Sequence, residues 1–531
     1  MILVLSTDKD RDWRAITHMA ELAWGHRVSV TNGAGEARFG ERVSTGVPGL
    51  DEVLGGGLPQ GHMYLVEGES GAGKTTLGMQ FLLEGHRRGE RTLWISLSEA
   101  ERELELIAGS HGWSLSGIAV ANPASPAREL DPQQQYSFFS PGDVELDDIR
   151  NAVVAAVEHV QPTRVVFDPF SDIRHLSRDV LRYRRQVLSL RELFASYDCT
   201  AILMQEGTRT GEGDLQAEAL AHGYITLQQD TADYGSQRRR LRVHKMRGIP
   251  FRDGYHDFAI RTGGLEVYPR LVAADHVEPM PETTLSSDVP ELDALIGGGL
   301  RRGSSTLLMG PAGVGKSIIA TQYAVAAARQ GETVALFIFD ETARSFLDRS
   351  ARLGLDLRDL AESGHVQLRQ VDAAEFSAGQ FTHMVVRAVS DDGASVVVID
   401  SLSGFLSAMP EERFLSSHLH ELLTYLGHRN VVTILTLAQH GILGSQLSSP
   451  LDISYLADTV LLLRYFEAFG AVRRAISVVK KRTGNHEVLV RELGVNDSGL
   501  HIGPPLADFE GVLTGNPRFT GIQADLSRDA R

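Results

Sequence analysis

Short apolar runs recur along the chain and alternate with longer segments in which polar and apolar residues follow a helical period. Runs of this length, bounded by polar segments, are typical of strands buried in a parallel sheet. They occupy residues 63–67, 92–97, 164–168 and 201–204 in the first half, and 306–309, 334–339, 396–400 and 431–435 in the second. The pattern predicts an α/β protein with two mostly parallel sheets, each flanked by helices.

Paired apolar runs follow near the end of each half, at 224–227 and 240–244 and again at 459–464 and 475–479. Closely spaced runs of this kind predict hairpins that close each sheet. Between the halves, Pro279 and Pro281 mark a linker.

These patterns divide the chain into five segments. The predicted boundaries are an N-terminal extension of unknown role (1–41), a first domain (42–270), a linker (271–285), a second domain (286–505) and a C-terminal tail (506–531). The extension matches nothing in the second half. The tail is expected to pack loosely because it is rich in Gly, Pro and Asp.

The two halves share a repeated sequence. Val47–Leu82 and Val289–Ala324 align at a constant offset of 242 residues (289 − 47), with fifteen identities in thirty-six positions. Each copy contains the motif G-x-x-x-x-G-K-[S/T], as Gly68–Thr75 and Gly310–Ser317. Each motif follows a predicted strand and opens a predicted helix, which is the context that the motif requires. The chain is therefore interpreted as a tandem duplication of a nucleotide-binding domain.

Glycine-rich loops of this type bind phosphate because successive backbone N–H groups point at its oxygens, and the following helix adds its positive end. We expect Lys74 and Lys316 to neutralise the β- and γ-phosphates of ATP, and the hydroxyls of Thr75 and Ser317 to ligate Mg²⁺. The predicted nucleotide-binding residues of the two loops are Gly68, Glu69, Ser70, Gly71, Ala72, Gly73, Lys74, Thr75 and Thr76, and Gly310, Pro311, Ala312, Gly313, Val314, Gly315, Lys316, Ser317 and Ile318.

Asp168 and Asp400 each end an apolar run. A carboxylate at that place would lie beside the glycine loop and hold Mg²⁺ through water. The alternative role is a helix N-cap after a strand. Their positions, 94 and 84 residues after the loop lysines Lys74 and Lys316, favour the metal role.

Acidic residues also follow the second predicted strand of each copy: Glu99, after Ser98, in the first and the pair Asp340-Glu341 in the second. Near a phosphate loop, a carboxylate can accept a proton from an attacking water or hydroxyl group. The alternative is an ordinary solvated helix start. Glu99, Asp340 and Glu341 are therefore the candidate catalytic residues.

Charge and composition narrow the functions that this arrangement can serve. With 52 basic and 68 acidic side chains the net charge is −16, which repels nucleic acid unless a local basic stripe compensates. No apolar stretch approaches the ~20 residues of a membrane span, and a cytoplasmic protein is expected. The single cysteine, Cys199, lies in an apolar run and is expected to be a buried apolar residue and not a reactive thiol.

Two basic strand ends share a Lys-x-Arg spacing: Lys245 and Arg247 in the first copy, and Lys480 and Arg482 in the second. Such residues can be solvated, can contact nucleic acid, or can reach a phosphate bound by the next subunit. The last interpretation is favoured because solvation alone gives no reason to keep the spacing in both copies.

The chain resembles the KaiC family of circadian clock ATPases over roughly residues 42–520. The resemblance is carried by Val47–Pro59 (VPGLDEVLGGGLP), the glycine loop, the acidic pair and the late Lys-x-Arg-Gly. It implies two tandem RecA-like P-loop NTPase domains in an ATP-dependent homohexamer of two stacked rings, with ATP at the subunit interfaces. The N-terminal ring would be an ATPase, and the C-terminal ring an autokinase and autophosphatase. By position, the Lys-x-Arg residues would touch the neighbouring subunit's nucleotide.

In that family the phosphoacceptors are a serine and then a threonine, placed before a strand that begins Asp-Thr. The resemblance places Ser454 and Tyr455 at these positions, ahead of Asp458-Thr459. Ser454 is therefore the predicted acceptor, and Tyr455 the less favoured one, although a serine before a strand is also a common turn residue. Tyrosine in place of threonine argues against an ordered two-site cycle. Ser98 in place of an acid predicts slower hydrolysis by the first domain.

The leading hypothesis is an ATP-dependent serine/threonine autokinase and slow ATPase that serves signalling or clock-like regulation through unidentified protein partners. The alternative from another class is a nucleotide-gated hexameric scaffold without kinase output. A DNA recombinase or helicase is a remote alternative, because residues 207–217 and 441–447 contain only Arg209 as a basic side chain. Neither nucleic acid nor a membrane is an expected partner.

Overall fold

The computed structural model describes residues 41–123, 141–177, 179–207, 215–230, 235–279, 282–407, 415–439, 454–496, 499–514 and 516–521. The predicted N-terminal extension lies outside the described residues apart from Glu41, and so do most of the two segments used to weigh DNA binding. None of the described helices combines the length and the apolar character that a membrane span requires.

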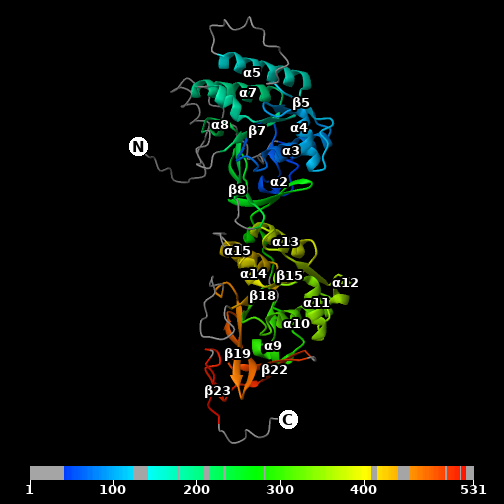
Figure 1. Cartoon of the computed structure of the whole chain (residues 1–531), viewed down its shortest axis with the longest axis vertical. Coiled ribbons are helices and arrows are strands. Elements are labelled where there is room, and N and C mark those ends of the chain that lie inside the picture. The colour runs from blue at the N-terminus through cyan, green and yellow to red at the C-terminus, as the bar shows by residue number, and fades with distance from the viewer. Residues whose placement is uncertain are drawn as a thin grey trace, which may run out of the picture. The chain divides into compact units, whose positions relative to one another are not determined.

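The first domain is built on a mixed sheet whose central strand precedes the glycine loop. Among the residues that the structure describes, nine strands take the order β11-β10-β9-β8-β3-β7-β6-β4-β5. Figure 1 labels β5, β7 and β8 of this sheet. They are β3 (Met63–Gly68), β4 (Thr92–Ser96), β5 (Ala119–Ala121), β6 (Arg164–Asp168), β7 (Thr200–Glu206), β8 (Gly223–Asp230), β9 (Arg238–Met246), β10 (Tyr255–Arg261) and β11 (Gly264–Tyr268). The strands from β8 to β5 pair in parallel, and those from β8 to β11 pair antiparallel.

The second domain repeats this order strand for strand. Read from its antiparallel edge, the sheet in the described part of the domain runs β22-β21-β20-β19-β14-β18-β17-β15-β16. Its strands are β14 (Ser305–Gly310), β15 (Val334–Ile338), β16 (Val366–Gln370), β17 (Val396–Asp400), β18 (Val432–Ala438), β19 (Thr459–Ala468), β20 (Ala471–Lys481), β21 (Arg491–Asn496) and β22 (Gly499–Pro505). The predicted α/β fold, the parallel strands and the closing hairpins are confirmed in both copies.

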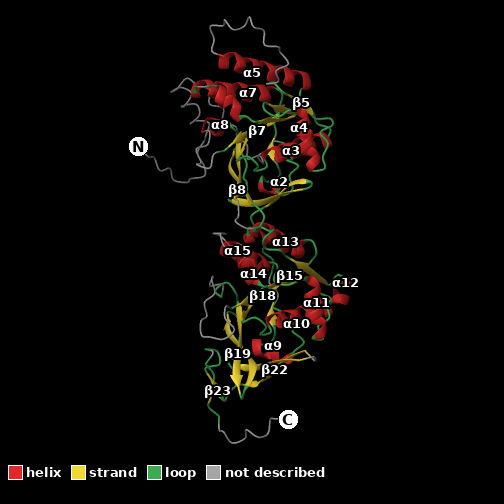
Figure 2. Ribbon diagram, in the orientation of Figure 1, coloured by secondary structure: helices red, strands yellow, loops and turns green. Residues whose placement is uncertain are grey.

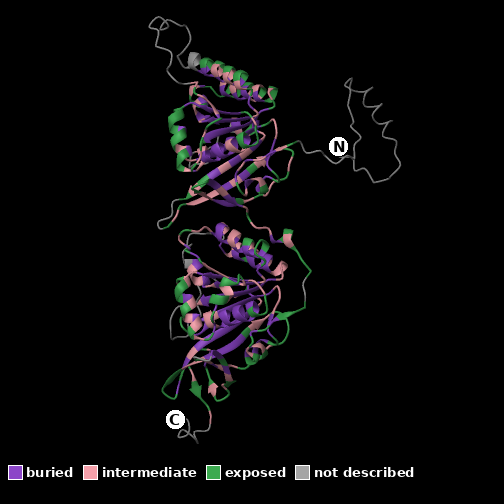
Figure 3. Cartoon of the chain, turned by 90° about the vertical axis from the view of Figure 1, so that its right-hand side faces the viewer, coloured by how far each residue is buried: buried purple, intermediate pink, exposed green. Residues whose placement is uncertain are grey.

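Helices cover both faces of each sheet (Figure 2). In the first domain they are α2 (Leu50–Val53), α3 (Lys74–Arg87), α4 (Glu101–Ser110), α5 (Pro141–Val160), α6 (Ser171–Leu176), α7 (Val180–Ser196) and α8 (Leu215–Leu220). Side chains alternate along a strand, so Val66 of β3 packs with α3 in one apolar cluster. Its neighbour Leu65 packs with α5 and α7 in a separate cluster on the opposite face. The central strands are accordingly buried on both faces (Figure 3).

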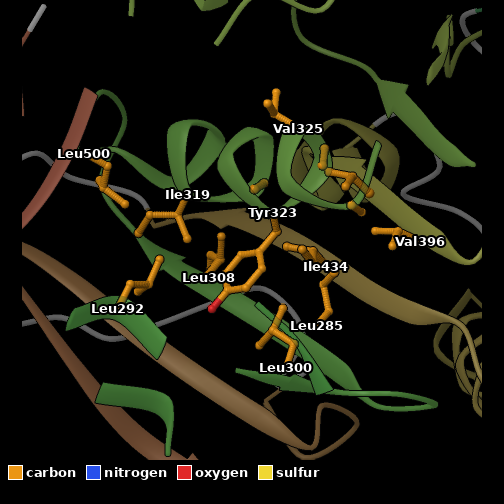
Figure 4. Packing of buried hydrophobic residues seen from close by; sticks show 14 of the residues in the cluster. Leu285, Leu292, Leu300, Leu308, Ile319, Tyr323, Val325, Val396, Ile434 and Leu500 are labelled. Carbon is orange, nitrogen blue, oxygen red and sulfur yellow. The ribbon is translucent and has the colours of Figure 1, made fainter. Parts of the chain in front are cut away.

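The second domain has the same two layers of helices. They are α9 (Pro290–Ile296), α10 (Lys316–Arg329), α11 (Ala343–Arg352), α12 (Arg358–Glu362), α13 (Ala378–Ser390), α14 (Leu402–Ser407) and α15 (Leu415–His428). Figure 4 shows Tyr323 of α10 among aliphatic side chains that include Leu292, Leu308 and Ile434. The Tyr323 hydroxyl lies 3.2 Å from an oxygen of Asp293, so its polar end is satisfied inside the core.

Several short elements of the described chain lie outside the two large sheets, among them three separate two-stranded pairs. They are β1 (Arg42–Val43) paired with β2 (Leu58–Pro59), β12 (Thr284–Leu285) paired with β13 (Leu300–Arg301), the 3₁₀ helix η2 (Ala273–His276), and β23 (Phe509–Glu510) paired with β24 (Arg518–Phe519). The linker segment packs on the second domain, because the Ala273 N–H donates to Glu421 of α15 at 3.1 Å.

The described residues of the tail are mostly exposed, but a small apolar cluster joins part of the tail to the second domain. Phe509 lies edge-on to Phe466 and Phe519, with ring centroids 5.6 and 5.4 Å apart. Val512 is 3% exposed. The Gly, Pro and Asp content hid three aromatic and aliphatic side chains that cover the end of the β19–β20 hairpin. The prediction for Cys199 is confirmed, because it is fully buried and burial raises its pKa to about 12.

A buried ion pair fixes the start of β6 in the first domain. The Arg164 side chain is 1% exposed and donates to Glu90 from Nε and Nη2, at 2.6 and 2.9 Å. Its Nη1 donates to the carbonyl oxygens of Ser44 and Phe81 at 2.7 and 2.9 Å. One guanidinium group therefore links four separate stretches of backbone.

We predict that Arg164→Ala destabilises the first domain by about 2 to 3 kcal/mol, because it leaves a partly buried carboxylate and two carbonyl groups without their donor. Chemical denaturation, monitored by hydrogen exchange of the β6 amides, measures the decrease in the free energy of unfolding. The matched control is Arg150→Ala, which removes an exposed ion pair with Asp147 at 3.8 Å and should cost less than about 0.5 kcal/mol. Equal effects of the two substitutions would contradict the structural role of Arg164.

Candidate functional site

The first glycine loop joins β3 to α3, and the side chain of its lysine forms hydrogen bonds with carbonyl groups at the start of the same loop. Lys74 Nζ donates to the carbonyl oxygens of Gly68 at 2.8 Å and Glu69 at 3.0 Å. Gly73, with φ of 104°, is the N-cap of α3. A Cβ atom at Gly68 would lie 2.7 Å from the Leu227 carbonyl oxygen, so the loop can start this close to β8 only with glycine.

The second loop has the same geometry. Lys316 Nζ donates to the carbonyl oxygens of Gly310 at 2.9 Å and Pro311 at 2.8 Å, and Gly315, with φ of 117°, is the N-cap of α10. Lys74 and Lys316 are each 8% exposed. Burial lowers the pKa of both ammonium groups, and nearby carboxylates oppose that shift. Each loop therefore offers one buried cation and a helix N-terminus, which fits a bound triphosphate.

Asp168 lies at the carboxyl end of β6 and accepts a hydrogen bond from Thr75 Oγ1 at 3.0 Å. Burial raises its pKa, and the Thr75 hydroxyl and the Lys74 charge oppose that effect. The N-cap alternative does not hold for Asp168, because α6 has Phe170 as its N-cap and no side-chain cap. A hydroxyl and a carboxylate placed together in this way could hold Mg²⁺ that is bound to a nucleotide.

The corresponding carboxylate of the second domain has a different partner. Asp400, at the end of β17, accepts a hydrogen bond from Thr436 of β18. Ser317 and Asp400 remain the predicted metal residues, and Ser317 is the second residue of α10, directly after Lys316. In the described part of the chain, no three His, Cys, Asp or Glu side chains gather into a protein-only metal cage. Mg²⁺ at a phosphate site needs no such cage.

Glu99 follows β4, and the Ser96 hydroxyl forms two hydrogen bonds with its backbone. The Ser96 hydroxyl donates to the Glu99 carbonyl at 2.7 Å and accepts from its N–H at 3.0 Å. Burial raises the pKa of the Glu99 carboxyl, and the negative charges of Asp168 and Glu103 raise it further. Glu99 therefore lies close enough to Asp168 for the charge of Asp168 to affect its pKa. The neighbouring Ser98 is exposed.

The two acids of the second domain differ in their surroundings. Asp340 accepts a hydrogen bond from Ser401, and its charge raises the pKa of Lys316, so it lies near the loop lysine. Glu341 is ion-paired to Arg349 of α11 at 2.5 Å. The sequence-based interpretation missed Ser401 and Arg349, and only the eight-residue spacing of Glu341 and Arg349 across a helix start could have indicated the ion pair.

The Lys-x-Arg pairs contact backbone carbonyls of their own chain. Lys245 Nζ and Arg247 Nη2 donate to the carbonyl oxygens of Glu218 and Ala219, each at 2.8 Å. In the second domain Lys480 Nζ donates to the Ser454 carbonyl at 2.8 Å, and Arg482 Nη2 to the Tyr455 carbonyl at 2.5 Å.

These contacts identify a structural correspondence that the repeat alignment did not include. Glu218 and Ala219 precede β8 as Ser454 and Tyr455 precede β19, and the same pair of basic residues holds each segment. The first domain therefore carries no hydroxyl group at the position of Ser454. Ser454 is half-buried, and the Tyr455 side chain is exposed.

Comparison with known proteins agrees with this geometry. The family model described as "ATPase: KaiC" matches residues 43–272 and again 285–507. Among curated proteins, the chain is 27% identical over 506 residues to the circadian clock protein KaiC3 of Synechocystis, covering 92% of this chain and 96% of that protein. It is 27% identical over 505 residues to the circadian clock oscillator protein KaiC of Thermostichus vulcanus, covering 92% and 95%.

We predict that ATP hydrolysis by the first domain decreases on acidification at a pH above the ~4.3 of an ordinary glutamate. A general base acts only when ionised, and the raised pKa of Glu99 keeps more of it protonated at any given pH. A pH–rate profile of the chain with and without Glu99→Gln tests this, and the variant should lose the inflection. Glu103→Gln removes one charge that raises the pKa and should shift the inflection to lower pH. Identical rates and profiles with and without Glu99→Gln would contradict the assignment.

Proposed function

Because the chain belongs to the KaiC family of ATPases, we propose that its two tandem RecA-like domains use ATP differently. The first domain hydrolyses ATP, with Glu99 accepting the proton of the attacking water. The second transfers the γ-phosphoryl group of ATP to the Ser454 hydroxyl. We further propose the assembly that the resemblance implies, a homohexamer of two stacked rings in which ATP lies between subunits.

One observation carries the kinase part of this proposal. The same basic pair holds the same segment in both domains, but only the second domain offers a hydroxyl group, at Ser454, where the first has Glu218. Lys480 and Arg482, which hold that segment, are also the residues proposed to reach the neighbour's nucleotide. The acceptor and the phosphate contacts would then come from one subunit, and the phosphate loop from the next.

The loop residues bind and orient the triphosphate in both domains. On nucleotide binding the Lys74 and Lys316 ammonium groups exchange loop carbonyls for phosphate oxygens, which stabilises the negative charge on the transferred group. Mg²⁺, when bound, supplies further charge neutralisation, and Thr75 with Asp168, or Ser317 with Asp400, would hold it.

In the second domain, attack by Ser454 Oγ forms a bond to the γ-phosphorus and breaks the bond from that phosphorus to the bridging oxygen, which leaves as part of ADP. The hydroxyl proton passes to an acid of the neighbouring subunit's second domain. Of the two candidates, Asp340 is the better placed, because Glu341 is paired with Arg349.

A nucleotide-gated scaffold without kinase output is the second candidate function. The ion pair between Glu341 and Arg349 favours it, because the guanidinium occupies, at 2.5 Å, a carboxylate oxygen that would otherwise accept the proton of the attacking hydroxyl. In that case ATP binding would assemble the rings and hydrolysis would reset them.

We predict that incubation with ATP and Mg²⁺ adds one phosphate per chain, and that Ser454→Ala prevents this addition. Intact-mass measurement followed by peptide mapping gives the result. Tyr455→Phe is the matched control, since it removes only the neighbouring hydroxyl and should leave the mass gain unchanged. No mass gain together with ATP-dependent assembly would support the scaffold instead, and a gain that persists in Ser454→Ala would reject Ser454 as the acceptor.

A further inference from the structure

A carboxylate that none of the sequence motifs includes lies at the carboxyl end of β7. Glu206 is the last residue of that strand, and it pairs in register with Gly68, the first residue of the glycine loop. The N–H of Gly207 donates to the Gly68 carbonyl at 3.0 Å. Because β7 lies between β3 and β6 in the sheet, Glu206 stands between the strand that carries the phosphate loop and the strand that ends in Asp168.

The alternation along the strands places Glu206 on the face of the phosphate-loop helix. Ile202 and Met204 of β7 pack in the cluster that contains α3, whereas Ala201 and Leu203 pack in the opposite cluster. Glu206 continues the series of Ile202 and Met204. By the same argument Asp168 lies on that face, because Val166 packs with α3. Two carboxylates on adjacent strands therefore point to the space in front of Lys74.

The electrostatic effect of Glu206 on its neighbours agrees with this placement. The charge of Glu206 raises the pKa of the Lys74 ammonium, second only to Asp168 among the carboxylates that oppose its burial. It also raises the pKa of Asp168 itself. Glu206 is exposed, so it is hydrated and can hold a water molecule. Glu206 thus interacts electrostatically with Lys74 and Asp168, the residues proposed to bind the phosphates and Mg²⁺.

The second domain has no acid at this position. Ala438 is the counterpart of Glu206, since it pairs in register with Gly310. The second domain instead has Asp340 where the first has Ser98. Besides Asp168 or Asp400 and the glutamate Glu99 or Glu341, each domain therefore has a further acid, Glu206 at the end of β7 or Asp340 after β15.

We propose that Glu206 orients the hydrolytic water of the first domain together with Glu99 and takes the place of the acid absent at Ser98. The assignment rests on the proposed role of this domain as the ATP hydrolase. Attack by the water oxygen forms a bond to the γ-phosphorus and breaks the bond to the bridging oxygen of ADP. Glu99 takes one proton of the water and passes it to solvent, and Glu206 accepts a hydrogen bond from the other hydrogen.

The test uses the full-length chain with the second-domain acids neutralised by Asp340→Asn and Glu341→Gln, so that turnover reports the first domain. In this background Glu206→Gln should lower kcat by about tenfold. The affinity for ADP, measured by direct titration, should be unchanged or higher, because a negative charge beside the phosphates has been removed. Glu105→Gln, at an exposed position of α4, is the matched control and should change neither quantity.

A rescue experiment distinguishes a role of Glu206 in orienting the water from a role in stabilising the fold. Adding Ser98→Glu to Glu206→Gln should restore most of kcat, because it returns a carboxylate to the same space from β4. The inference is wrong if Glu206→Gln leaves kcat unchanged while Glu99→Gln lowers it. It is also wrong if Glu206→Gln weakens ADP binding and lowers Tm together, which indicates a structural role. If neither Glu99→Gln nor Glu206→Gln affects kcat, the proposed hydrolytic site of the first domain itself fails.

Discussion

A lysine ammonium group buried at the end of a parallel strand is the constraint around which each domain is organised. An ammonium group with so little access to water needs oxygen atoms on several sides. In the structure, two loop carbonyls provide them for Lys74 and two for Lys316. Three features stabilise this buried charge. They are the glycine positions of the loop, the close approach of the loop to the neighbouring strand, and the carboxylates at the ends of the adjacent strands. A triphosphate would replace the carbonyls with stronger acceptors.

Around this common centre the two domains have diverged in their acids and in the groups that hold them. Thr75 bonds Asp168 in the first domain, whereas Thr436 bonds Asp400 in the second. Backbone pairing with Ser96 fixes Glu99, whereas Arg349 binds the side chain of its counterpart. Duplicated sites with unequal acids are suited to unequal chemistry, because the number and position of bases around a phosphate decide whether water or a hydroxyl is activated.

The strands and the phosphate loops could be predicted from the sequence because both are local signals. An apolar run such as 396–400 is buried wherever its sheet lies, and the glycine loop brings its own backbone geometry. Contacts that join distant segments left no local signal. The bond from Ser401 to Asp340 and the carboxylate of Glu206 beside Gly68 depend on strand order, which periodicity does not specify. The aromatic packing of Phe509 was missed because turn residues surround it.

The buried guanidinium of Arg164 also limits how the two copies can exchange residues. Gly85 lies inside α3, where glycine costs about 1 kcal/mol relative to alanine, yet a Cβ atom there would lie 2.5 Å from Arg164 Cδ. The second domain has Ala327 and Val396 at the corresponding positions. Alanine in this helix is therefore compatible only with a short side chain at the start of the facing strand. The first copy therefore keeps glycine, a poor helix former, where α3 faces Arg164, and an alanine at this position becomes acceptable only once the arginine has been replaced.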